Sequence, residues 1–129
     1  MQDPLETPPA VDLRSEVVNA LLDVEQALQR LEGDEELFRL VLGVFLETLP
    51  ELLDAVSGAC AASNASALRE AAHALKGAAA AVCAEAVRAT AERLEELGRG
   101  GVLTGADALS TELREHADRL LATLARSRA

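Results

Sequence analysis

The chain is short of aromatic residues. Phe38 and Phe45 are its only aromatics, and Trp and Tyr are absent from the 129 residues. A core of ordinary size must therefore be built from Leu, Val and Ala, and both Ala and Leu favour helices. Proline and glycine cluster at a few places and do not recur at the short intervals typical of an all-β domain. These shortages favour a single all-α domain.

Basic residues are also few. The sequence contains 12 Lys and Arg against 22 Asp and Glu, which gives a formal net charge of −10. Such a charge repels nucleic acid and anionic membrane surfaces. Charged residues interrupt every apolar run before the roughly 20 residues of a membrane span, and no cationic segment followed by an apolar run opens the chain. We therefore expect a cytoplasmic protein that binds neither nucleic acid nor membrane.

Signatures of bound cofactors are missing as well. Cys60 and Cys83 are the only cysteines, and in a helix-rich chain of this kind they are more often small core residues than a disulfide or a metal site. The sequence contains no Gly-rich phosphate loop, no H-E-x-x-H motif and no Cys/His cluster. We expect no cofactor and no nucleotide site in this chain.

What the sequence does contain is helical periodicity in five segments. The first ten residues hold three of the four prolines and are expected to form a flexible tail, which leaves 11–129 as the folded domain. The short polar or glycine-containing breaks imply antiparallel neighbours, so we predict an antiparallel up-down four-helix bundle with an additional N-terminal helix. No apolar seam outside the core is evident, which favours a monomer. The expected helices cover 11–31, 34–61 with Pro50 inside it, 65–82, 84–98 and 106–126.

One histidine lies on the wrong side of its helix for a core residue. On a helical wheel one core direction is shared, within about 40°, by Leu68, Ala72, Leu75, Ala79 and Val82. His73 lies about 140° away from that direction. Gly77 lies opposite the core, and Lys76 is one turn from His73. Arg69 and Ala80, about 100° and 120° from the core direction, border the same face. We expect His73 to point into solvent.

The glycine near His73 needs an explanation. In an exposed helix a glycine costs about 1 kcal/mol relative to alanine. A bare backbone at Gly77 would let another protein approach the imidazole, and Lys76 would place a positive charge near any group attached to that ring. Imidazole is nucleophilic near neutral pH and can hold a phosphoryl group. The alternative, a solvated surface histidine beside a tolerated glycine, stays open on these residues alone.

A family resemblance favours the first interpretation. The run His73-Ala74-Leu75-Lys76-Gly77 resembles the H-x-L-K-G-S-A signature of histidine-phosphotransfer (HPt) domains. Segments 33–37, 45–52 and 92–99 resemble the flanking helices of that family at similar spacing. Two positions depart from its usual pattern, because the family has Ser where Ala78 stands and Gly near Cys83. Neither departure affects His73 or Lys76.

The resemblance implies a phosphorelay carrier. A receiver domain phosphorylated on an aspartate would pass its phosphoryl group to Nε2 of His73, and a second receiver would later take it. Lys76 would neutralise the phosphoryl charge, and Gly77 would leave room for the receiver, with Arg69, Ala80 and Arg99 at the docking surface. Glu95 matches a position whose Glu or Gln binds the other ring nitrogen. Mg²⁺ would lie in the receiver, and a sensor or hybrid kinase would act upstream. The chain itself would then be a covalent phosphoryl carrier and not an enzyme.

Two alternative functions and a second histidine also need consideration. The chain could instead resemble the phosphoacceptor domain of a chemotaxis-type histidine kinase, or it could be a helical adaptor in which His73 is incidental. His116 shares a stripe with leucines on 106–126 and is expected to be a partly buried structural residue.

Overall fold

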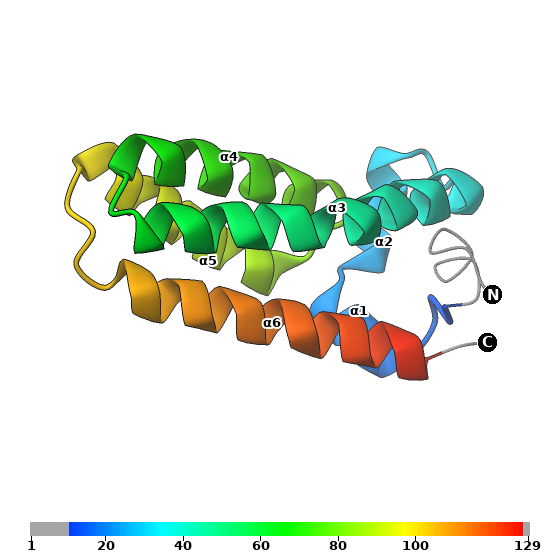
Figure 1. The fold of residues 1–129 in the computed structure, drawn as a ribbon. Helices are drawn as coiled ribbons and strands as arrows, with labels where there is room; N and C mark the ends of the chain where they lie inside the picture. The colour runs from blue at the N-terminus through cyan, green and yellow to red at the C-terminus, as the bar shows by residue number, and fades with distance from the viewer. Residues whose placement is uncertain (1–10, 128–129) are drawn as a thin grey trace.

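A computed structural model of the protein describes residues 11–127, which contain six helices and no strand (Figure 1). The predicted all-α class is confirmed. The expected N-terminal tail lies outside the described residues. The helices are α1 (Glu16–Leu21), α2 (Val24–Arg30), α3 (Glu35–Ala61), α4 (Ala65–Ala81), α5 (Glu85–Gly100) and α6 (Ala106–Arg126).

The starts of α3 and α4 follow from capping side chains. Oδ1 of Asp34 accepts a hydrogen bond of 3.0 Å from the backbone N–H of Leu37, and Oδ1 of Asn64 accepts one of 3.0 Å from Ala67. Each satisfies a backbone donor that has no partner inside its helix. Pro50 lies inside α3, so the prediction that the helix continues past this proline is confirmed.

The prediction of a single N-terminal helix over 11–31 is wrong, because the structure divides this segment into α1 and α2. Leu22 is fully buried and has an extended backbone. Asp23 caps α2 through Gln26, and its own backbone N–H donates 3.0 Å to the carbonyl oxygen of Cys83. The break brings Leu22 into the core and fastens this segment to the turn between α4 and α5. Apolar spacing continues across the break, which is why the sequence resembled one helix.

The helix expected over 84–98 continues slightly further than predicted. In the structure α5 extends to Gly100. The helix ends at Gly101, whose φ of 75° is a left-handed conformation that glycine adopts without steric cost. Gly105, with φ of 86°, precedes α6 in the same region.

The four long helices form the body of the structure. In Figure 1, α3, α4 and α6 run alongside one another with α5 behind them, and α1 and α2 lie towards one end. The contact between α4 and α5 is the most extensive, α3 packs against α4 and α6, and α6 also packs against α5. The largest fully buried side chains include Phe38, Leu42, Leu49, Leu68, Leu75, Leu94 and Leu113.

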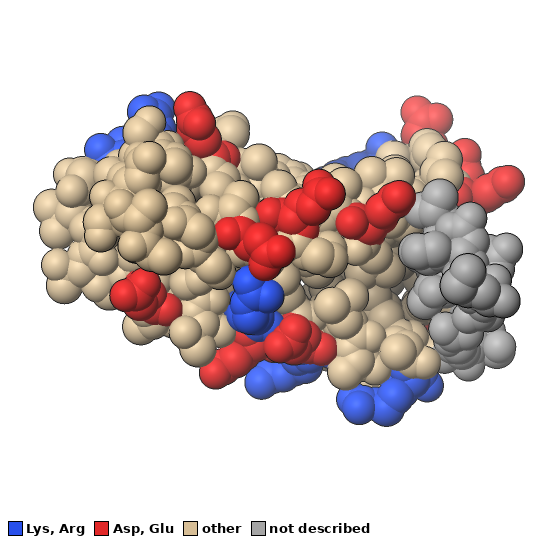
Figure 2. All heavy atoms as spheres, viewed as in Figure 1, with Lys and Arg blue, Asp and Glu red and all other residues tan. Residues whose placement is uncertain are grey.

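The surface is acidic, as the composition requires. On the face drawn in Figure 2, acidic side chains spread over the surface with basic ones between them and at its edges. That face carries no continuous basic surface. Within residues 11–127, no helix is both long enough and apolar enough to cross a membrane.

Candidate functional site

The His73 side chain projects from the middle of α4 and is 70% exposed, as the helical wheel predicts. The opposite face of α4 is buried through Leu68, Ala72, Leu75 and Ala79. Nδ1 of His73 lies 2.6 Å from Oε2 of Glu95 on α5. No other hydrogen bond to the ring occurs among the described residues. The contact at Nδ1 therefore fixes the ring with Nε2 directed away from Glu95.

Glu95 is buried although it carries a charge, with only 3% of its surface exposed. It follows Leu94 and lies four residues after Ala91, so it falls on the face of α5 that packs inward. Oε1 accepts a 2.5 Å hydrogen bond from Nζ of Lys76. Nη2 of Arg99 lies 3.6 Å from Oε2. The position of Glu95 relative to the buried residues Ala91 and Leu94 was the signal in the sequence for its burial.

Hydrogen bonds keep Glu95 ionised. The bond from Lys76 contributes most to holding the pKa of this carboxyl below its usual value; burial opposes it, and the bond from His73 adds to it. An ionised carboxylate only accepts hydrogen bonds, so the short contact with His73 requires a proton on Nδ1. In the neutral ring, Nε2 then carries the lone pair.

Lys76 forms an ion pair with the neighbouring helix. Its side chain is 26% exposed, and its ammonium pairs with Glu95 on α5. His73 and Lys76 thus contact the two oxygens of one carboxylate. Spacing along α4 could not reveal this, because the carboxylate comes from another helix.

Gly77 leaves the surface beyond His73 open. It is exposed, and a Cβ atom at this position would meet nothing within 4 Å. Packing inside the protein therefore does not require glycine here. Ala80, one turn further on, is half-buried, and its carbonyl oxygen accepts a 3.1 Å hydrogen bond from Nη1 of Arg30.

Arg69 and Arg99 lie beside His73 at the interface of α4 and α5. Together with Ser66, Glu70, His73 and Glu95 they line a cleft of about 420 Å³ between α4 and α5. Two basic residues therefore line the cleft beside His73 and Glu95.

An apolar groove that was not predicted from the sequence lies between α3 and α4. Leu40 is 61% exposed and Val44 is 52% exposed on α3. Both face a groove of about 290 Å³ whose opposite wall includes Ala78 and Ala81. Leu37, Leu40 and Val44 recur at helical spacing and form a second apolar stripe beside the core stripe. These residues form an exposed apolar surface outside the core, which the periodicity of the core stripe does not indicate.

The family model described as the Hpt domain matches residues 40–123, well over half of the chain, and this range includes His73 and Glu95. The chain belongs to the Hpt domain family. The resemblance found in the sequence is confirmed, and with it the general activity of histidine phosphotransfer in two-component relays. Hpt domains are phosphocarriers and not conventional enzymes. Neither the curated proteins nor the solved structures yield a match.

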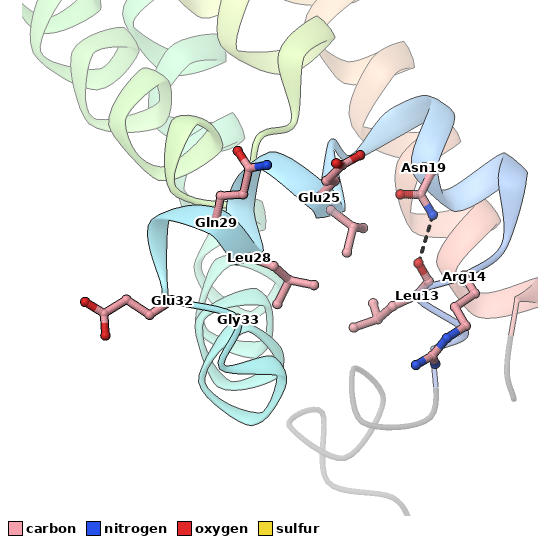
Figure 3. Close-up of a pocket in the computed structure, with 9 residues that line it drawn as sticks. Leu13, Arg14, Asn19, Glu25, Leu28, Gln29, Glu32 and Gly33 are labelled. Atoms are coloured by element: carbon pink, nitrogen blue, oxygen red, sulfur yellow. Dashed lines mark hydrogen bonds between the residues drawn. The ribbon is translucent and has the colours of Figure 1, made fainter.

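A pocket of this Hpt domain that is larger than the cleft and the groove lies away from His73, and its lining residues offer no similar nucleophile. It has a volume of about 740 Å³ and lies beside α2, where Leu13, Glu25 and Leu28 line it (Figure 3). Asn19 at its edge donates a 2.8 Å hydrogen bond to the carbonyl oxygen of Leu13, so this amide has a structural partner. No His or Cys lines it.

Other nucleophiles and ligands of the Hpt domain are less suited to the chemistry. Burial raises the pKa of both Cys60 and Cys83, which keeps them as neutral thiols near pH 7. His116 is 25% exposed, and its Nε2 lies 3.8 Å from Glu112 on the same helix. Between residues 11 and 127, no group of three or more His, Cys, Asp or Glu side chains could hold a metal ion.

Proposed function

We propose that the chain is a histidine-containing phosphotransfer protein of a multistep phosphorelay. It accepts a phosphoryl group on His73 from the aspartate of one receiver domain and passes it to another receiver, downstream of a sensor or hybrid histidine kinase. The observation that carries this proposal is the exposed imidazole whose Nδ1 is bound, over 2.6 Å, by the buried carboxylate of Glu95. This contact leaves Nε2 as the outward nucleophile.

The proposed transfer step is a substitution at phosphorus. The lone pair of Nε2 attacks the phosphorus atom, the bond between phosphorus and the aspartyl oxygen breaks, and the aspartate leaves as a carboxylate with the bonding pair. The imidazole gains positive charge as the new P–N bond forms. The proton on Nδ1 still faces Glu95, whose negative charge stabilises the ring. Return of the group to a second receiver reverses these changes.

Neighbouring cations favour the negatively charged phosphoryl group. Lys76 lies one turn from His73 on α4, and its ammonium can turn from Glu95 toward a phosphoryl group on Nε2. Arg69 and Arg99 add two guanidinium groups at the adjacent cleft. In a chain of net charge −10, these cations reduce repulsion of an acidic phosphodonor locally.

The receiver would cover Gly77 and the surface on both sides of it. The apolar groove supports this orientation, because Ala78 in its wall follows Gly77 directly on α4 and Ala81 lies about one turn after Gly77. Exposed Leu40 and Val44 would pack against the receiver, with Ala80 and the two arginines at the border. We propose that the four long helices form an antiparallel up-down framework that presents this surface.

The remaining assignments follow from the same function. The phosphoryl transfer needs Mg²⁺, which we expect in the partner receiver. Free Cys60 and Cys83 are compatible with a reducing compartment, so we propose that the protein acts in the cytoplasm. We also propose that it acts as a monomer, because the receiver would cover its exposed apolar groove.

Phosphotransfer profiling tests the function. The chain is incubated with a panel of receiver domains that carry radiolabelled phosphoryl groups, and label on the chain is followed. We expect an acid-labile, base-stable adduct on the wild type and on the control His116→Gln, and none on His73→Gln. Labelling of His73→Gln would disprove the acceptor assignment, and absence of label from wild type with every receiver would contradict the relay function.

A further inference from the structure

Gly98 on α5 is enclosed by the backbone of α4. It is buried, and a Cβ atom there would lie 2.6 Å from the amide nitrogen of Arg69 and 2.8 Å from the carbonyl oxygen of Ala65. The Cα of Arg69 would be 2.9 Å away. All three are backbone atoms, which a rotamer change cannot displace. Any side chain at position 98 would therefore have to move the two helices apart.

This close contact lies one helical turn from the candidate site. Gly98 is three residues after Glu95 on α5, and Arg69 is four residues before His73 on α4. The contact at Gly98 and the 2.6 Å hydrogen bond between His73 and Glu95 are thus neighbouring points on one helix–helix interface. Over a single turn a packed helix moves as a nearly rigid unit.

The two helices are held at the distance that the hydrogen bond needs. To restore an ordinary van der Waals distance around a Cβ atom at position 98, the backbones would have to separate by about 1 Å. The distance between Nδ1 of His73 and Oε2 of Glu95, now 2.6 Å, would then lengthen beyond the usual range for a hydrogen bond. Glu95 would lose its hydrogen bond to Nδ1 of His73, although its own side chain was unchanged.

We infer that Gly98 is a positioning residue of the phosphoacceptor site: the missing side chain sets the separation of α4 and α5 that keeps Glu95 on Nδ1 of His73. This inference rests on the proposed function for its kinetic consequence. The glycine of the H-x-L-K-G motif, Gly77, faces open surface, whereas Gly98 acts from inside the interface. The two glycines therefore serve His73 in different ways.

Gly98→Ala tests the inference, with Gly58→Ala as its matched control. Gly58 also lies inside a helix, but a Cβ atom there would meet nothing within 4 Å. The readout is the ¹⁵N NMR spectrum of the His73 ring in the unphosphorylated protein, which reports which nitrogen carries the proton. We expect the Nδ1-protonated form in wild type and Gly58→Ala, and a mixture of tautomers in Gly98→Ala. Phosphoryl transfer should be about tenfold to a hundredfold slower in Gly98→Ala alone.

The close contact itself is tested in the wild type. A strong nuclear Overhauser effect between an Hα of Gly98 and the amide proton of Arg69 is expected, and its absence would overturn the inference. If Gly98→Ala does not fold in buffer, the ring spectrum is recorded with trimethylamine N-oxide, which favours the compact state. A folded Gly98→Ala protein with the wild-type tautomer would also overturn it. Because the ring spectrum needs no phosphoryl group, failure of the relay function would appear separately, as wild-type protein that takes no label.

Discussion

Lys76 and Glu95 form an ion pair between α4 and α5, with 2.5 Å between Nζ and Oε1. The other carboxylate oxygen of Glu95 lies 2.6 Å from Nδ1 of His73. The cation suited to the phosphoryl group and the acid that orients the ring therefore interact directly. A change at one of them is expected to alter the other.

A double-mutant cycle measures this coupling. Lys76→Met removes the shortest partner of a buried carboxylate and should lower the free energy of unfolding by about 1–3 kcal/mol. Glu95→Gln keeps the shape of the side chain but removes its charge, so adding Lys76→Met to it should cost clearly less. Urea unfolding of the four proteins gives the coupling free energy, expected at about 0.5 kcal/mol or more. Additive effects would show that the ion pair contributes nothing to stability.

The lowered pKa of Glu95 predicts a pH dependence of stability. A carboxyl group whose pKa is lower in the folded state stabilises the fold at pH values above its unfolded pKa, near 4.5. This contribution is lost as the pH falls through the lower folded value. The difference in unfolding free energy between wild type and Glu95→Gln should therefore shrink as the pH falls below about 4. A difference that grows as the pH falls from 4.5 to 3 would contradict the assigned shift.

Substitutions at Gly77 should separate access from folding. Gly77→Ala introduces no clash and should stabilise the exposed helix by up to about 1 kcal/mol. Gly77→Gln should fold equally well but place a long side chain between the receiver and the imidazole, slowing phosphoryl transfer by about tenfold or more. Thermal unfolding and transfer rates on the same samples make the comparison. Wild-type transfer by Gly77→Gln would refute the role in access.

Three non-glycine residues at helix ends have left-handed backbones: Glu32, Ser63 and Cys83. Ser63 and Cys83 should respond differently to glycine. Ser63 has φ of 50° and is exposed, so Ser63→Gly relieves the steric cost and should stabilise the protein by about 0.5–1 kcal/mol. Cys83 has φ of 55°, but its side chain is only 7% exposed. Cys83→Gly also loses that buried side chain, and its net effect should be near zero. Urea unfolding of both variants checks the order.

The apolar groove predicts which surface binds the receiver. Leu40→Ser should weaken receiver binding by about tenfold, because an apolar contact at the edge of the groove is lost, and it should hardly change stability. Val17→Ser is the matched control, since Val17 is 59% exposed on α1, away from the groove. Binding is measured by titration calorimetry with a receiver that transfers to the chain. Equal weakening by both substitutions would argue against docking at this groove.

Local signals in the sequence were sufficient for most helices and for the exposed histidine. Asp34 and Asn64 marked helix starts because capping depends on residues only three apart. The outward direction of His73 followed from helical period alone. The break at Leu22 and Asp23 was not foreseen, since it depends on the burial of Leu22 and on a hydrogen bond to Cys83, sixty residues away in the chain.

The sequence by itself determined an all-helical acidic chain with a nucleophilic imidazole in solvent beside a glycine and a lysine. The tertiary structure decided how that imidazole is held. Burial of Glu95 against α4, its sharing between His73 and Lys76, and the close approach at Gly98 all arise between two helices. Periodicity gives the direction of each side chain about its own helix axis. The distance between two helices is set by the side chains that both contribute at the contact, so only the packed structure could supply it.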